Sequence, residues 1–154
     1  MSVTAQSIQS DSVVKLRSAM PWDLTEEEVG YFVTAVDTDD RSGGVETTTR
    51  AISSGEMQLW VWRDEDQICV IVTEVLFHRD NSKEMLVTML SGNNVVENYL
   101  VVSDAVLSKA KDYGCDRMIA FVKPDILDAL VESGYERDAN YDFDSIYTVI
   151  AKEV

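Results

Sequence analysis

The hydrophobic period of this sequence changes from helical to strand spacing at Gly55, and that change constrains the fold more than any other feature. Before Gly55 the apolar residues recur at helical spacing. After it come three segments rich in strand-forming residues, separated by short polar turns: residues 57–63, 68–77 and 84–91. Turns this short predict an antiparallel meander. The middle segment is largely apolar along its whole length, which is typical of a strand covered on both faces.

The second half of the chain returns to helical periods and then to strands. Apolar residues at spacings of three and four predict a long helix from Val95 to about Gly114. Residues 117–122 then form a short apolar strand, Pro124 opens another helix that Gly134 closes, and a hairpin-like pair follows at residues 135–141 and 145–151. The order predicts one α/β (α+β) domain over residues 1–154, with a mixed, mostly antiparallel central sheet flanked by helices.

The N-terminal part, residues 1–44, is expected to be helical. Thr25 and Glu28 have the spacing of a capping box, and an apolar stripe continues from there to about Asp37. A short apolar cluster suggests one further short helix within residues 1–20. Residues 45–53 predict a helix that ends at Gly55.

The charge narrows the possible partners. The chain has 13 lysine and arginine residues against 28 aspartate and glutamate residues, a formal net charge of −15. Phosphate backbones are bound by cationic side chains, so we expect no direct contact with nucleic acid or with an anionic membrane. Three interpretations remain: a solubilising surface, a face that attracts a basic partner protein, or an acidic mimic of nucleic acid.

The sequence gives little support for a membrane protein, a secreted protein, a disulfide-bonded protein or a metal-binding protein. No segment reaches the roughly 18 apolar residues that a membrane helix needs, and the first residues are neither basic nor apolar, so we expect no signal peptide. Cys69 and Cys115 are expected to be buried free thiols. With a single histidine, His78, and no CxxC pair, we expect no metal site.

Three short segments, together with the order of elements, resemble a known family. They are Ser54–Trp60, Ala110–Arg117 and Leu127–Tyr135. Over residues 45–151 the chain is similar to the Gcn5-related N-acetyltransferases (GNAT), and especially to degenerate GNAT-like proteins encoded by tailed bacteriophages. The resemblance implies a GNAT-like sheet, a location in a virion or in the cytoplasm of a bacterial host, and virion components among the partners.

In the family, the pyrophosphate of acetyl-CoA lies on a loop of the type Arg/Gln-x-x-Gly-x-Gly/Ala before the long helix. The resemblance implies that the equivalent residues here are Leu90, Ser91, Gly92, Asn93 and Asn94. This segment has one glycine and no cation, and no lysine or arginine occurs from residue 84 to residue 108. Coenzyme A is multiply anionic, so these features argue against tight binding.

The helix that follows this loop carries two further signals. Asn94 and Glu97 have the spacing of a second capping box, which would satisfy the first N–H groups of the helix itself. Glu97 would also place a negative charge where the phosphates lie in the family. We therefore expect no cofactor, or acetyl-CoA if the protein is an active enzyme.

Glu74 is the candidate catalytic residue, because the family often uses a strand carboxylate as base and burial could raise its pKa. Glu84 is a second candidate. The alternative is that Glu74 lies exposed or pairs with an arginine, as structural carboxylates commonly do. Tyr113 and Tyr135 are expected to be packing residues with hydrated hydroxyls rather than general acids.

The remaining candidates have ordinary structural explanations. His78 is expected to be a solvated turn residue. Trp60 and Trp62, two apart on one strand, share a face and favour the core over an interface.

Three functions follow from these observations. The first is a GNAT-like protein with an eroded acetyl-CoA site, a virion or accessory protein that acts through contacts with a protein partner. The alternative is an acetyl-CoA-dependent N-acetyltransferase, in which a substrate amine attacks the thioester directly. The third is an acidic inhibitor that mimics nucleic acid, which requires carboxylates in a row along one face.

Overall fold

The computed structural model describes residues 15–39, 42–122, 124–137 and 148–154. The strands are β1 (Arg17–Ala19), β2 (Met57–Asp64), β3 (Gln67–Phe77), β4 (Lys83–Gly92), β5 (Arg117–Val122), β6 (Glu136–Arg137) and β7 (Thr148–Glu153). The helices are a 3₁₀ turn η1 (Pro21–Asp23), α2 (Glu26–Asp37), α3 (Val45–Ser54), α4 (Val95–Asp112) and α5 (Pro124–Glu132).

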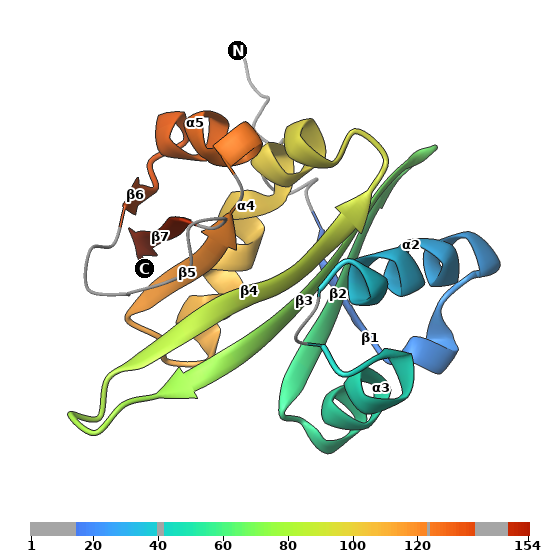
Figure 1. The fold of residues 1–154 in the computed structure, drawn as a ribbon, viewed down its shortest axis with the longest axis horizontal. Helices are drawn as coiled ribbons and strands as arrows, with labels where there is room; N and C mark the ends of the chain where they lie inside the picture. Colours follow the sequence, from blue (N-terminus) through green and yellow to red (C-terminus); the bar gives the residue numbers. More distant parts are fainter. Residues whose placement is uncertain (1–14, 40–41, 123, 138–147) are drawn as a thin grey trace, which may run out of the picture.

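The strands form one seven-stranded sheet in the order β1-β2-β3-β4-β5-β7-β6 (Figure 1). Neighbouring strands are antiparallel except β4 and β5, which run parallel because α4 connects them. Their pairing ends at Val87 and Ala120, and β4 then diverges from β5 (Figure 1). At the same level a bulge leaves Thr88 without a partner on β3, because Thr73 pairs with Val87 and Val72 with Met89.

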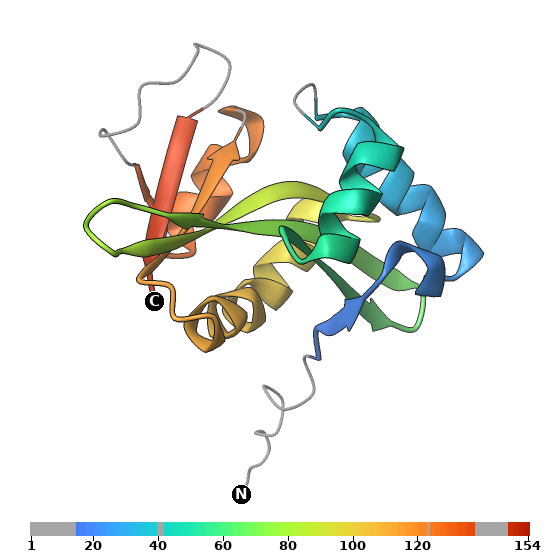
Figure 2. The same cartoon turned by 90° about the horizontal axis from the view of Figure 1, so that it is seen from below.

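Helices cover both faces of the sheet (Figures 1 and 2). α2 and α3 pack on one face, where Phe32, Val36 and Ile52 contact alternate residues of β2 and β3. α4 and α5 pack on the other, where Tyr99, Val102 and Leu130 contact the intervening residues. β3 is therefore apolar on both faces, as its sequence predicted.

Most predicted elements are present, and one is corrected. The meander, the long helix and the antiparallel pairing of the last two strands are confirmed. In the described part of residues 1–20, the chain forms β1 instead of the predicted short helix, because the backbone of residues 17–19 pairs with Leu59–Val61 of β2. Residues 1–14 and 138–147 lie outside the described residues.

The predicted capping box at the start of α2 is confirmed and has a second use. Thr25 Oγ1 accepts from the N–H of Glu28, and Glu28 Oε1 accepts from the N–H of Thr25. The Glu28 side chain, almost fully buried, also binds Arg17 of β1 at 2.9 Å and Arg63 of β2 at 3.1 Å. One carboxylate thus fixes the first turn of α2 onto two strands.

The predictions for the two cysteines and for two of the tryptophans are confirmed. Cys69 and Cys115 are free and buried, as expected. Trp60 and Trp62 are core residues on the α4 face, as favoured. In the described parts of the chain no helix is long and apolar enough to cross a membrane.

Candidate functional site

The loop between β4 and α4 is where the cofactor site was expected, and its glycine has a structural role. Gly92 adopts φ +151°, and a Cβ atom there would lie 2.1 Å from the carbonyl oxygen of Ile68 on β3. Only glycine allows the two strands this close approach. The requirement for Gly92 therefore comes from the β3–β4 packing. Leu90 and Ser91, the residues before it, belong to β4, and Ser91 is buried.

The next residue, Asn93, is committed to the turn between β2 and β3. Its Oδ1 accepts a hydrogen bond from the N–H of Ile68 at 2.8 Å, and its Nδ2 donates to the carbonyl of Asp66 at 2.6 Å. Asn98 of α4 extends the connection, because its Nδ2 donates to Gln67 Oε1 at 2.9 Å and to the Asn93 carbonyl at 2.7 Å. The side chains of Asn93 and Asn98 thus form their hydrogen bonds within the protein, with the β2–β3 turn, the start of β3 and the loop itself.

The predicted capping box at Asn94 and Glu97 is wrong. Asn94 has a left-handed backbone, with φ 44° and ψ 51°, and its side chain does not cap α4. Its Nδ2 instead approaches Gln67 Oε1 at 3.4 Å. A capping side chain needs an extended backbone at this position, and the left-handed turn places the amide elsewhere.

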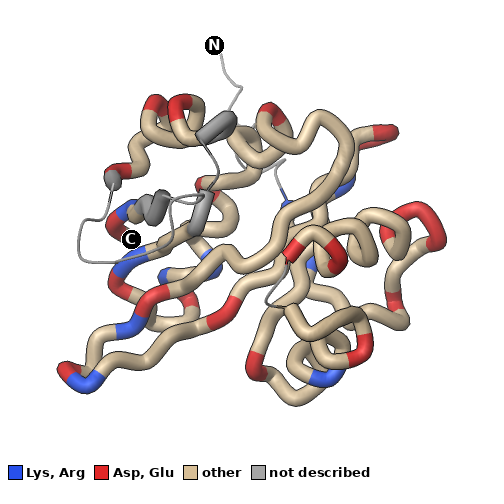
Figure 3. The backbone as a smooth tube through the Cα atoms, in the orientation of Figure 1, with Lys and Arg blue, Asp and Glu red and all other residues tan. Residues whose placement is uncertain are grey.

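The first turn of α4 has one feature that favours the binding of an anion and one that disfavours it. Among the described residues, no acceptor takes the backbone N–H groups of residues 95–97, and free N–H groups at a helix start favour an anion. Glu97, exposed in the same turn, disfavours one. The run from residue 84 to residue 108 adds no cation (Figure 3).

Glu74, the candidate base, lies away from this loop. It pairs across the sheet with Met57 of β2 and Leu86 of β4, and it lines a groove with Glu56 that contains no residue of the β4–α4 loop. Burial, and then the charge of Glu56, raises the pKa of Glu74 above its usual value. The carboxylate has no hydrogen bond or ion pair among the described residues, so the arginine pairing is not found. A role as base stays a prediction.

The tyrosines do not supply a general acid. The hydroxyls of Tyr99 and Tyr135 lie 2.8 Å apart in the core. Burial raises the pKa of Tyr135 to about 12 and that of Tyr99 well above its usual range. Tyr135 is a packing residue as predicted, but its hydroxyl is buried and bonded to Tyr99 rather than hydrated. Tyr113 ends α4 and is partly exposed.

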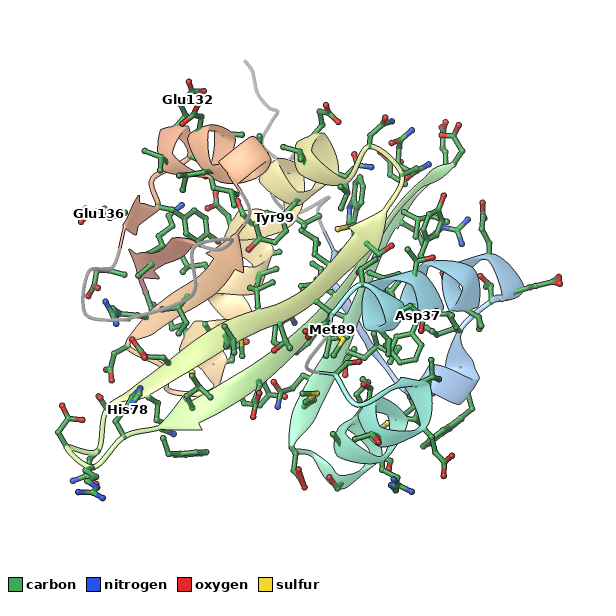
Figure 4. The ribbon with its side chains drawn as sticks, viewed as in Figure 1. Asp37, His78, Met89, Tyr99, Glu132 and Glu136 are labelled. Carbon is green, nitrogen blue, oxygen red and sulfur yellow. The ribbon has the colours of Figure 1, made fainter. Side chains whose placement is uncertain are left out.

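A cluster at the β3–β4 turn was missed by the sequence reasoning. His78 Nε2 lies 2.7 Å from Glu84 Oε1, and Arg117 donates to the other oxygen of the same buried carboxylate through Nε at 2.7 Å. Glu84, the second candidate base, is thus engaged by two side chains. His78 lies near the tip of the β3–β4 hairpin (Figure 4) and is partly exposed, as expected of a turn residue, but its ring is bonded to Glu84. Sequence alone does not reveal that Glu84 and Arg117 are register partners on neighbouring parallel strands.

In the part of the chain that the structure describes, no group of three histidine, cysteine, aspartate or glutamate side chains comes together.

No protein-family model and no curated protein matches the sequence. Solved structures do match the fold. One is a chain of the NatC complex bound to Gag peptide and CoA, with a TM-score of 0.63 and 12% identity over 92% of this chain and 98% of that one.

Two bacterial structures are similar in the same way. The acetyltransferase of the GNAT family from Streptococcus pneumoniae has a TM-score of 0.60 and 13% identity, covering 92% of this chain and 99% of that one. The Campylobacter jejuni N-acetyltransferase PseH, in complex with acetyl coenzyme A, has a TM-score of 0.58 and 13% identity, covering 91% and 98%. This chain therefore has the fold of the GNAT acetyltransferases.

Proposed function

We propose that this protein is a GNAT-fold protein with an eroded acetyl-CoA site that acts through contacts with a protein partner and does not transfer acetyl groups. The observation that carries the proposal is the commitment of the β4–α4 loop to its own fold. Gly92 is required by the Ile68 carbonyl, and Asn93 is bonded to Ile68 and Asp66. The use of Gly92 and of the Asn93 side chain by the protein's own fold supports the proposal.

Charge supports the same conclusion. A pyrophosphate needs cations or free N–H groups to offset its charge. Here the stretch around the loop has no lysine or arginine, and Glu97 lies in the helix turn where the phosphates would bind. The net charge of −15 adds a general repulsion for a multiply anionic cofactor and favours a basic partner. The resemblance to tailed-phage proteins extends the proposal to contacts within a virion or during infection.

The active N-acetyltransferase remains the second candidate because one observation favours it. Among the described residues no acceptor takes the N–H groups at the start of α4, and the pairing of β4 with β5 ends at Val87 and Ala120, before β4 leads into that helix. In that reaction the substrate amine forms a bond to the thioester carbonyl carbon, the C–S bond breaks, and the coenzyme A thiolate leaves with the amine proton returned to solvent through a base. Glu74 would be that base.

The third function, an acidic mimic of nucleic acid, has less support. It requires carboxylates spaced along one face like phosphates. The acidic residues are instead distributed over α2, α3, α5 and the turns, on several sides of the molecule (Figure 3).

The test is the melting temperature of the protein with millimolar acetyl-CoA or free CoA. A ligand at about 100 times its dissociation constant raises the free energy of unfolding by about 2.7 kcal/mol, which for a chain of this size is about 5–10 °C. We expect no shift with either ligand. A clear shift in the wild-type protein contradicts the proposal and favours the transferase. A Glu97→Lys variant separates the causes: binding gained only in this variant identifies charge as the excluding factor.

A further inference from the structure

A groove of about 410 Å³ lies at the edge of the sheet where β2 begins. β3 continues through Phe77 after its last pairing with β2, at Glu74 and Met57, so a notch opens beside the end of β3. The α3–β2 connection closes one side of the notch and the C-terminal end of α4 the other. The residues that line it are Gly55, Glu56, Gln58, Glu74, Val75, Phe77, Lys83 and Tyr113.

The electrostatics of this groove favour a cation. Glu56 and Glu74 both line it, and neither has a hydrogen bond or an ion pair within the described ranges. Their mutual repulsion helps to raise the pKa of Glu74, after burial as the larger cause. Tyr113 is the C-cap residue that follows Asp112 at the end of α4, so the negative end of the helix dipole also lies at the groove. A positive charge bound in the groove would be attracted by the two carboxylates and by the negative end of the helix dipole.

Two aromatic rings make the groove suited to an ammonium group in particular. Phe77 is 76% exposed and Tyr113 is 43% exposed, so both rings are accessible from solvent. The face of an aromatic ring attracts a cation electrostatically. Carboxylates and rings together fit a primary ammonium on an alkyl stem, because the stem packs on the rings while the charge meets the carboxylates.

The chain already places one of its own ammonium groups against these walls. Lys83 Nζ lies 5.6 Å from the centre of the Phe77 ring and donates to the carbonyl of Tyr113 at 3.1 Å. This contact is independent of the acidic residues and shows that the aromatic side of the groove accepts a lysine. Lys83 occupies that side, while Glu56 and Glu74 have no partner of their own among the described residues.

The opposite wall is held in place by buried hydrogen bonds. Trp60 Nε1 donates to Thr73 Oγ1 at 2.9 Å, and Thr73 Oγ1 donates to Gln58 Oε1 at 2.9 Å. The ring of Trp60 also contacts that of Tyr113, with centroids 6.3 Å apart. A site whose walls are fixed before binding loses less entropy when it is occupied.

We propose that this groove is a docking site for a lysine side chain of a basic partner protein, with the ammonium between Glu56 and Glu74 and the stem against Phe77 and Tyr113. The inference rests on the proposed function, which needs a protein partner. It concerns a different place, since α4 has 18 residues and its two ends lie about 27 Å apart at 1.5 Å per residue. Acetyl-CoA binding at one end and lysine binding at the other are therefore measured separately.

The experiment is an NMR titration of the ¹⁵N-labelled protein with an acetylated and amidated Gly-Lys-Gly peptide. We expect amide resonances of residues 55–58, 74–77 and 113 to shift, and the same peptide with norleucine in place of lysine to shift none. A Glu56→Gln/Glu74→Gln variant should weaken binding about fivefold or more, and Phe77→Ala about threefold. Lys83→Met should strengthen binding, because it removes the internal competitor.

A matched pair of substitutions controls for the overall charge. Glu132→Gln/Glu136→Gln removes the same two charges from exposed positions on α5 and β6 (Figure 4). We expect binding within about twofold of wild type for this variant. Equal weakening by both double variants, shifts scattered over the acidic surface, or equal binding of the norleucine peptide would each overturn the proposal. Acetyl-CoA binding with an intact lysine titration would refute the proposed function alone.

Discussion

The side-chain oxygen of Asn93 accepts a hydrogen bond from the backbone N–H of Ile68 at 2.8 Å, while its amide nitrogen donates to the carbonyl of Asp66 at 2.6 Å. One side chain from the β4–α4 loop thus completes the backbone pairing at the start of β3. The Asn93 side chain therefore serves the hairpin, and its contribution can be measured as stability.

Asn93→Ala should lower the free energy of unfolding by about 1–3 kcal/mol, because the Ile68 N–H and the Asp66 carbonyl both lose their partner. Urea denaturation measures the change. The matched control is Asn94→Gly, which keeps the left-handed backbone and removes only a 3.4 Å contact; we expect a change within about 0.5 kcal/mol. Equal effects of the two substitutions would show that Asn93 is not a structural tie.

Gly92→Ala should be among the most damaging single substitutions in the chain. The added methyl group meets the Ile68 carbonyl oxygen at 2.1 Å, so the strands must separate or the fold must fail. We expect a loss of at least about 2 kcal/mol, measured by thermal and urea unfolding. Gly30→Ala in α2 is the control, since no atom lies within 4 Å of its Cβ position. Alanine is the better helix former there and should stabilise by about 0.5–1 kcal/mol.

Glu28→Gln should destabilise the protein in a pH-dependent way. Burial raises the pKa of Glu28, but hydrogen bonds from Arg17, from the Thr25 N–H and from Arg63 outweigh it, so the pKa lies below its usual 4.5. A carboxyl with a lowered pKa contributes stability above the unfolded value and loses it as the pH falls through the folded value. The difference between wild type and variant should therefore be full at neutral pH and shrink below pH 4.5. Urea titrations across that range measure it, and a difference that does not vary with pH would contradict the ion-pair explanation.

Glu74→Gln should raise the stability of the protein at neutral pH, which is the opposite of the effect expected for Glu28→Gln. Burial and the charge of Glu56 raise the pKa of Glu74 above 4.5, so its contribution to stability is present below pH 4.5 and is lost as the pH rises through the folded value. At neutral pH the variant should be more stable than wild type, and the two should converge in acid. Glu56→Gln should give part of the gain by lowering the pKa of Glu74. A destabilised Glu74→Gln variant at neutral pH would show that the carboxylate has a favourable partner.

Sequence patterns predicted the elements well where local energy decides them. The change of period at Gly55, the double apolar pattern of β3 and the stripe of α4 each predicted an observed element. The end of α3 was also predicted, because Gly55 takes the left-handed conformation that closes helices. β1 was missed, since a strand of three residues exists only through its pairing with β2.

The role of segment 90–94 as a cofactor site stays a prediction. Residues 90–92 belong to β4, and only Asn93 and Asn94 lie between β4 and α4. The bonds of Asn93, the contact of Gly92 with Ile68, and the pairing of His78 with Glu84 each join a strand residue to a residue of another strand, a loop or a turn. Such contacts depend on strand register and turn geometry, which a single sequence does not specify.

The two predicted capping boxes have the same spacing, and they show which predictions a sequence pattern supports and which depend on the tertiary structure. Thr25 and Glu28 form theirs, because Thr25 has the extended backbone that a cap requires and Glu28 gains Arg17 and Arg63 as further partners. Asn94 and Glu97 do not, because the turn from β4 forces Asn94 into a left-handed conformation. Sequence by itself determined the elements, their order and the excess of negative charge. Only the tertiary structure decided which polar side chains of the β4–α4 loop bind other parts of the protein. Their partners lie on the β2–β3 turn and on β3, and the packing of β3 against β4 brings these distant parts of the chain together.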